Sequence, residues 1–137
     1  MTPSPWTYFS VEELSCHCGC GQMKMNADFM DKVVKFRQFY GPLIVNSAYR
    51  CEAHDSAVGT STTPGSGPHT MGRAIDFKVT ASESFAFMAA ALKLGLFSGY
   101  GLDERQSIQD EARFIHCDDL KPGEFPSHAR PGCWTYP

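Results

Sequence analysis

The sequence predicts a single α+β domain with a small, mostly antiparallel sheet and flanking helices. Its 137 residues suit one compact domain, and neither an internal repeat nor a long linker divides them. Two stretches carry apolar residues at helical spacing, and another alternates apolar and polar residues as a strand does. The expected order is helix, helix, strand, loop, strand, helix, strand, strand, which is typical of an α+β domain.

The first two expected helices each begin at a recognisable cap. Ser10 starts a Ser-Val-Glu-Glu sequence with the spacing of a capping box, which predicts a short helix after it. Asn26 can cap a second helix over residues 27–40, which a Gly-Pro pair then ends. The apolar side chains of this helix recur on one stripe, namely Phe29, Val33, Phe36 and Tyr40.

The middle of the chain combines a short strand, a long loop and a longer strand. Residues 43–45 form an apolar run that predicts a short buried strand. Over residues 51–68 the composition turns to Gly, Ser, Thr and Pro, which predicts a long loop, and loops of such length are usually functional or mobile. Residues 73–79 alternate as a strand, with Ala74, Asp76 and Lys78 on one face and Ile75, Phe77 and Val79 on the other.

A third helix and two more strands complete the expected fold. Ser82 or Ser84 can cap the helix, which reaches about Leu94. The side chains predicted to face inward are Phe85, Met88, Ala89 and Leu92. Further strands are expected over residues 97–102 and 113–117.

Composition and charge exclude several classes of function. The net charge is −3, so the chain lacks the basic surface of a nucleic-acid-binding domain. No stretch approaches the roughly 20 apolar residues that a membrane span needs. Residues 1–10 have neither a basic start nor an apolar core, so no signal peptide is expected and the chain is expected to be made in the cytoplasm. We expect a soluble monomer.

Three potential metal ligands, His69, Asp76 and His116, lie in separate predicted elements. His69 ends the long loop, Asp76 lies on the next strand, and His116 alternates with Phe114 and Asp118 on the last predicted strand. Two imidazoles and a carboxylate would give zinc three protein ligands and leave a fourth position open, as catalytic sites require. The same pattern also fits a loop histidine, a surface aspartate and a core histidine, so spacing alone leaves both interpretations open.

Four sequence blocks follow one another along the chain: Ser47-Ala-Tyr-Arg50, then His54, then His69-Thr-Met-Gly-Arg-Ala-Ile-Asp76, then Phe114-Ile-His-Cys-Asp118. Together they resemble the M15 family of zinc peptidases. The resemblance is greatest to the short phage and bacterial branch of that family, subfamily A, which is D-alanyl-D-alanine carboxypeptidase-like. It spans residues 9–136 and includes the early Cys-Gly-Cys-Gly turn and the final Pro-x-x-Trp-x-Tyr.

The resemblance implies a hedgehog/DD-peptidase fold, one zinc ion held by the three candidate ligands, and hydrolysis of peptide bonds in bacterial peptidoglycan. Arg50 matches the family arginine that faces the substrate or polarises its carbonyl, with a salt bridge that orients the loop as the alternative. Ser47 and Tyr49 are expected to contact substrate. His54 is suited either to that role or to pinning the loop, whereas His128 is expected to be structural or exposed.

The sequence leaves open which residue takes the proton from the attacking water. Some family branches have an acid three residues before the last histidine, but this chain has Arg113 there. Asp118 shares the face of His116 and is either the general base or the partner that orients that imidazole. Glu111 and Asp110, just upstream, are further candidates for the base.

Six cysteines are many for a cytosolic domain of this size. Cys16, Cys18 and Cys20 are spaced more tightly than a zinc knuckle, and no second pair nearby completes four ligands. Buried free thiols and disulfides formed in an oxidising exterior are therefore both open. No cysteine has the histidine arrangement of a catalytic thiol.

The leading hypothesis is a zinc-dependent peptidase that cuts stem peptides or cross-links of peptidoglycan, in the manner of a single-domain phage endolysin. Such an enzyme would reach the wall after a separate protein had permeabilised the membrane. The alternative is a hedgehog-like binding module in which zinc is structural and the cleft holds a ligand without turnover. Arg50 and Asp118 favour the enzyme, and the peptide bond that is cut stays open.

Overall fold

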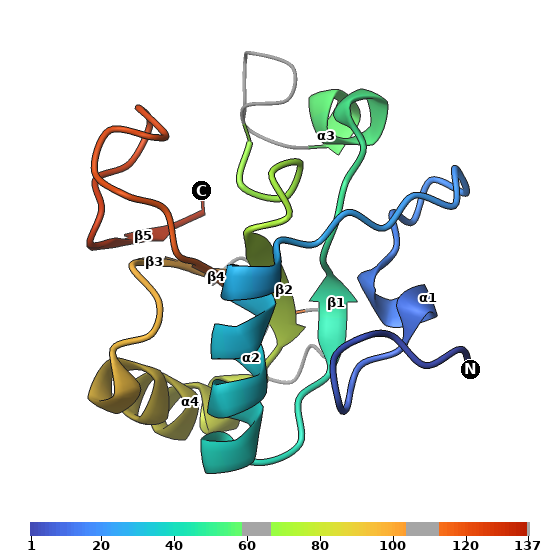
Figure 1. Ribbon diagram of the computed structural model, residues 1–137. Coiled ribbons are helices and arrows are strands. Elements are labelled where there is room, and N and C mark those ends of the chain that lie inside the picture. Colours follow the sequence, from blue (N-terminus) through green and yellow to red (C-terminus); the bar gives the residue numbers. More distant parts are fainter. Residues whose placement is uncertain (59–66, 104–112, 137) are drawn as a thin grey trace.

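The structure is a computed structural model that describes residues 1–58, 67–103 and 113–136 (Figure 1). Within these ranges five strands form one sheet, in the order β1-β2-β4-β3-β5. The strands are β1 (Val45–Ser47), β2 (Ala74–Lys78), β3 (Gly99–Leu102), β4 (Phe114–Asp118) and β5 (Gly132–Thr135). The helices are α1 (Val11–Leu14), α2 (Ala27–Tyr40), α3 (Glu52–Val58) and α4 (Ala81–Leu94).

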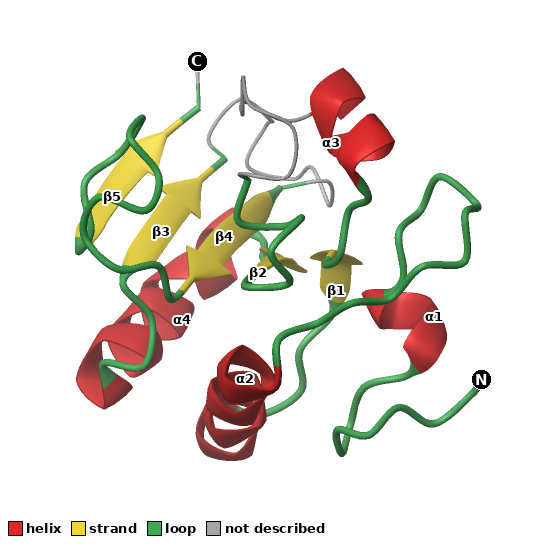
Figure 2. Cartoon of the chain, turned by 45° about the horizontal axis from the view of Figure 1, so that its top comes forward, coloured by secondary structure: helices red, strands yellow, loops and turns green. Residues whose placement is uncertain are grey.

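Neighbouring strands pair antiparallel except at one edge, where β5 runs parallel to β3. Figure 2 shows β5 at one end of the sheet and β1, close to α1, at the other. The predicted α+β class, with a mostly antiparallel sheet and flanking helices, is therefore confirmed. In the part of the chain that the structure describes, no helix is both long and apolar enough to cross a membrane.

Helices α2 and α4 cover one face of the sheet and build the core with it (Figures 1 and 2). The predicted stripe of α2 is confirmed, since Phe29, Val33 and Phe36 are fully buried. Phe36 meets Phe77 of β2 and Phe87 of α4 at ring-centroid distances of 6.4 and 5.0 Å. Truncating such a ring to alanine typically costs about 3–5 kcal/mol. Because the core holds one face of β2 and β4, their opposite face is left to carry polar side chains.

Helix α4 presents a different face to the core from the one predicted. Phe85 and Leu92 are 86% and 59% exposed, whereas Phe87 and Ala91 are buried. Met88 packs against the core as predicted. The prediction is wrong for Phe85, Ala89 and Leu92, because apolar residues lie nearly all round this helix and packing against α2 selects among them. The helix also begins before Ser82 and Ser84, with Thr80 as its cap.

Three other elements differ from expectation. The first strand lies at Val45–Ser47 and not at 43–45, and it is only half-buried because β1 is an edge strand. The start of the expected long loop is helix α3, Glu52–Val58, on which Asp55 turns inward and is buried. Strand β5 was not predicted, because its parallel pairing with β3 depends on a contact that no local sequence pattern shows.

Candidate metal centre

Two neighbouring strands and one turn bring the three candidate ligands together. Asp76 of β2 and His116 of β4 are direct cross-strand partners on the face opposite the core. His69 lies in the turn before β2, with Nε2 3.2 Å from Asp76 Oδ1. The same oxygen is 3.0 Å from His116 Nδ1. All three side chains are buried, and one ligand atom from each lies within 4.8 Å of the others, so together they could hold a metal ion.

Hydrogen bonds on the far side of each imidazole select the nitrogen that is left for a metal. His69 Nδ1 lies 2.7 Å from the carbonyl oxygen of Ala48, which can only accept, so Nδ1 keeps its proton and Nε2 is left. His116 Nε2 lies 2.7 Å from Asp118 Oδ2, so Nε2 donates and Nδ1 is left. Histidines that bind metals usually donate their other N–H in this way. The set therefore fits zinc, which accepts imidazole nitrogen and carboxylate oxygen.

Asp118 is fully buried and an arginine holds it. Arg130 donates from Nε to Oδ1 at 2.8 Å and from Nη2 to Oδ2 at 2.6 Å, and the backbone N–H of Leu120 also donates to Oδ1. Burial raises the pKa of Asp118, but hydrogen bonds from His116 and Arg130 outweigh burial and hold that pKa well below its usual range. This carboxylate also lies on the side of His116 away from the other ligands. It is suited to orienting the imidazole and poorly suited to accepting a proton.

Two glycines on β3 leave room for the side chains that support β4. A Cβ at Gly99, the cross-strand partner of Asp118, would lie 2.5 Å from Arg130 Nε. A Cβ at Gly101 would lie 2.5 Å from Trp134 Nε1. Both distances are too short for real contacts, so a side chain at either position would displace the group that rests there.

Arg50, in the loop after β1, holds the carboxylate ligand. Its Nη2 donates to Asp76 Oδ2 at 3.1 Å, which leaves Oδ1 directed at the two histidines. Its Nη1 donates to Asp55 Oδ1 and its Nε to Ser47 Oγ, each at 3.3 Å. The guanidinium therefore orients Asp76 while it faces the cleft described below.

The charges and hydrogen bonds of this centre shift the pKa of Asp76 and of His116. Burial raises the pKa of Asp76, but the charge and hydrogen bonds of His69 and His116 outweigh it and hold that pKa well below its usual range. Burial lowers the pKa of His116, but its hydrogen bonds to Asp118 and Asp76 raise it to about 9. A metal ion that binds at Nδ1 of His116 therefore competes with a proton for that nitrogen.

The centre opens into a cleft of about 300 Å³. The carboxyl-terminal segment supplies one wall, through Phe125, His128, Arg130, Trp134 and Tyr136. The loop after β1 and helix α3 supply another, through Ser47, Arg50 and Asp55. A molecule that enters the cleft therefore meets the three candidate ligands directly.

The predicted substrate-binding residues lie in different places. Ser47 and Arg50 line the cleft. Tyr49 and His54 are not among the described residues that line it. Tyr49 is instead buried with two cysteine side chains in a second, smaller apolar cluster.

His128, expected to be structural or exposed, lines the cleft. It stacks on Trp134 with 4.4 Å between ring centroids and 2° between planes, and Trp134 lies 5.5 Å from the His116 ring. Burial and the charge of Arg130 lower the pKa of His128, so its imidazole is neutral near pH 7. Burial raises the pKa of Tyr136, on the same wall, to about 12, so its phenol keeps its proton. No local pattern marks His128, because it lies in the irregular segment between β4 and β5.

A buried pair of histidines and an aspartate, opening into a cleft, define a candidate mononuclear zinc centre of the kind that metallopeptidases use. The family model described as Peptidase M15 matches residues 7–118, and the chain belongs to that metallopeptidase family. The matched segment contains all three candidate ligands. Membership implies the hedgehog/DD-peptidase fold, in agreement with the mostly antiparallel sheet. A search of curated proteins gave no match.

Proposed function

We propose that the protein is a zinc-dependent peptidase that hydrolyses peptide bonds of bacterial peptidoglycan, in stem peptides or cross-links. The observation that carries the proposal is the buried set of His69, Asp76 and His116 beside a cleft. Neighbouring hydrogen bonds orient the two imidazoles so that one nitrogen of each is left for a metal ion. Membership of the Peptidase M15 family supports peptide hydrolysis. Resemblance to the D-alanyl-D-alanine carboxypeptidase-like branch supports a cell-wall substrate.

Zinc bound by these ligands would supply a Lewis acid for the scissile carbonyl and would lower the pKa of bound water. Arg50 keeps Asp76 Oδ1 directed at the histidines. Because Arg50 lines the cleft, its permanent positive charge would lie beside the scissile carbonyl of a bound peptide. That charge would stabilise the negative oxygen that develops during attack on the carbonyl. Asp118, itself held by Arg130, keeps the proton of His116 on Nε2.

His128 is the described cleft residue best suited to move a proton. Of the other described ionisable groups in the cleft, three are the candidate ligands, two are arginines, one is the protonated phenol of Tyr136, and one is Asp55, which is paired with Arg50. The neutral imidazole of His128 would accept the proton of the attacking water and return it to the leaving amine. Glu111 and Asp110, the other bases considered from the sequence, lie outside the described residues.

Replacing His128 with glutamine is expected to lower kcat about 10²–10⁴-fold, the usual contribution of a general base. A base protonated in acid cannot accept a proton, so the wild-type activity should fall at a pH below the ordinary histidine pKa of about 6.5. The variant should lose this fall in activity on the acid side. Steady-state hydrolysis of a soluble stem peptide between about pH 5 and 8 measures both effects.

Two controls separate proton transfer from packing at His128. Zinc content should stay at the wild-type value in the glutamine variant, since His128 is not a candidate ligand. His128→Phe keeps a flat ring against Trp134 but has no nitrogen. If the phenylalanine variant were fully active, His128 would only support Trp134 and the assignment as base would be wrong.

Digestion of purified bacterial sacculi tests the proposed activity. We expect new amino and carboxyl termini in the peptide portion, an intact glycan, loss of activity after chelation, and recovery with zinc. Mass spectrometry of the fragments distinguishes cleavage at D-Ala–D-Ala, at L-Ala–D-Glu and at the D-Ala–diaminopimelate cross-link. Intact sacculi after incubation with zinc-loaded protein would contradict a peptidase and favour a binding module.

We further propose that the enzyme acts as a monomer at the bacterial cell wall, in the role of a phage endolysin. The resemblance to the short phage and bacterial branch supports this role. A net charge of −3 offers these residues little electrostatic attraction to an anionic wall. Cells that express the protein should then lyse only when a second agent permeabilises the inner membrane, and lysis without permeabilisation would contradict this role.

A further inference from the structure

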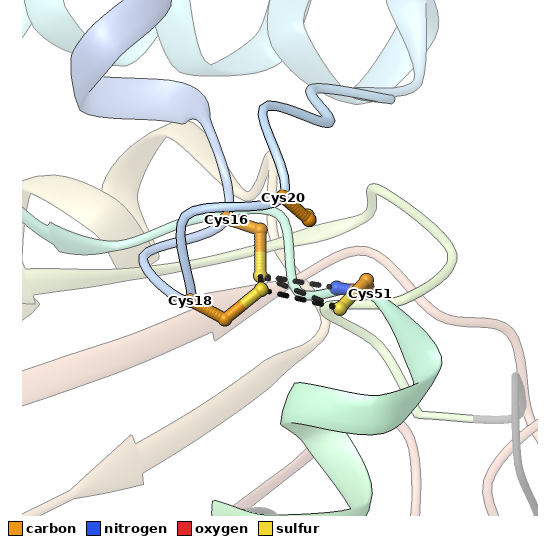
Figure 3. Close-up of side chains that lie close together, drawn as sticks. All are labelled: Cys16, Cys18, Cys20 and Cys51. Carbon is orange, nitrogen blue, oxygen red and sulfur yellow. Dashed lines mark hydrogen bonds between the residues drawn. The ribbon is translucent and has the colours of Figure 1, made fainter.

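Four cysteines from two distant segments converge on one point (Figure 3). Cys16, Cys18 and Cys20 belong to the turn-rich segment after α1, and Cys51 directly precedes α3. The sulfur of Cys16 is 3.4 Å from that of Cys18 and 3.7 Å from that of Cys51. The sulfurs of Cys18 and Cys51 are 3.6 Å apart, and with Cys20 all four lie within 4.8 Å of one another. No second pair of cysteines lies nearby in the sequence, but the fold supplies a fourth sulfur through Cys51, 35 positions beyond Cys16.

These separations suit a shared metal ion and not a disulfide. Four sulfurs at about 2.3 Å from a central zinc ion, arranged as a tetrahedron, lie about 3.8 Å from one another. A disulfide brings two sulfurs to about 2.05 Å and leaves the others without a role. The three measured distances, 3.4–3.7 Å, lie close to the tetrahedral value. All six cysteines of the chain, each within the described residues, are free thiols.

The backbone of the turn gathers its sulfurs on one side. Gly19 and Gly21 have φ angles of 89° and 75°, a conformation that glycine adopts readily and that folds the Cys-Gly-Cys-Gly segment back on itself. The N–H of Cys16 donates to the carbonyl of Gln22 at 2.9 Å and closes the turn. The backbone N–H of Cys51 donates to Cys16 Sγ at 3.4 Å, a contact that favours a thiolate at this position.

We propose that Cys16, Cys18, Cys20 and Cys51 bind a structural zinc ion, distinct from the candidate metal centre. Structural zinc sites bind the ion through four protein ligands, commonly thiolates, and leave no coordination position open. Cys16 and Cys51 are buried while Cys18 and Cys20 are exposed. The ion would therefore lie near the protein surface, where solvent can reach it.

This second ion would tie the amino-terminal segment to the loop that carries Arg50. Arg50 directly precedes Cys51, and α3, with the buried Asp55, directly follows it. Tyr49 packs within the same cluster, and its N–H donates to the carbonyl of Leu14 in α1 at 3.2 Å. Because Arg50 orients a candidate ligand, the cysteine site would hold one wall of the cleft in place. The site itself does not depend on whether the protein is a peptidase.

Cobalt(II) substitution and metal analysis test the second site. Full-length protein reconstituted with cobalt should show intense sulfur-to-metal charge-transfer absorption and the d–d bands of a tetrahedral tetrathiolate. Zinc analysis should give two ions per chain in the wild type and one in Cys18→Ser/Cys20→Ser. Both substituted side chains are exposed, so the core of this variant is undisturbed. The thiolate bands should persist in His116→Ala, in which only the candidate metal centre is lost.

Cys133→Ser is the matched control, since Cys133 is exposed and lies outside the cluster. It should retain both ions and the full cobalt spectrum. Absence of thiolate bands from the wild type would overturn the proposal, as would a mass two hydrogens lower that reveals a disulfide within the cluster. A zinc content unchanged by the double substitution would also overturn it. None of these readouts requires hydrolytic activity, so failure of the peptidase proposal would leave them interpretable.

Discussion

His116→Ala is expected to abolish zinc binding at the candidate metal centre and to lower the proposed peptidoglycan hydrolysis at least about 10³-fold. The reason is that Lewis-acid stabilisation by zinc is worth several kcal/mol, and each 1.36 kcal/mol changes the rate tenfold. The remaining pair, His69 and Asp76, offers only two ligands. Release of new amino termini from sacculi, measured beside zinc content, reports both losses. His69→Ala should behave in the same way.

The loss should reflect the site and not the fold. The core lies on the opposite face of the sheet, and the pair formed by Asp118 and Arg130 is retained in His116→Ala. The circular dichroism and the thiolate spectrum of the cysteine site should therefore match the wild type. Full hydrolysis by metal-depleted His116→Ala would refute the assignment of this histidine as a ligand.

Asp118→Asn is expected to weaken zinc binding about 10–100-fold and to lower the free energy of unfolding by about 3–5 kcal/mol at pH 7. Affinity falls because the amide holds the His116 N–H less firmly than the carboxylate does. Stability falls because the buried Arg130 is left without a counter-charge. Zinc titration and urea unfolding measure the two effects. Activity per bound zinc should change little, whereas a large fall in turnover at full zinc occupancy would make Asp118 the general base.

The stability effect should depend on pH in a definite direction. Burial raises the pKa of Asp118, but hydrogen bonds from His116 and Arg130 hold it below its usual range in the folded protein, while in the unfolded chain it is about 3.9. The stabilisation is therefore complete above about pH 4 and is lost as the pH falls toward the folded-state value. Wild type and variant should differ most near pH 7 and converge in acid. Asp118→Asn/Arg130→Met, which removes both charges, should recover part of the loss, and failure to do so would locate the effect elsewhere.

Two of the candidate metal ligands, Asp76 and His116, could be placed on one face of the sheet from the sequence because folding preserves the alternation of a strand. Strand alternation places His116 and Asp118 on one face of β4, and the same rule places Asp76 on the matching face of β2. The motif resemblance then distinguishes a metal site from unrelated polar residues. Alternation could not assign a role to Asp118, because that role depends on Arg130, which reaches it from the segment before β5.

The remaining features depend on contacts between distant segments. Cys51 joins the other three cysteines only after the loop following β1 folds against the turn after α1, so local spacing could not reveal the group of four. His128 is placed by its stack on Trp134 in β5, a strand whose parallel pairing no local pattern shows. On α4, apolar residues surround the axis, and only the packing of Phe87 against Phe36 selects the buried face.

Anomalous diffraction at the zinc edge, from crystals of protein shown to hydrolyse sacculi, tests the central claim most directly. We expect one zinc ion bound by His69 Nε2, His116 Nδ1 and an oxygen of Asp76, with Asp118 bound to the other side of His116 and not to the ion. A catalytically active protein with no zinc among these three side chains would contradict the claim, as would zinc bound through His116 Nε2.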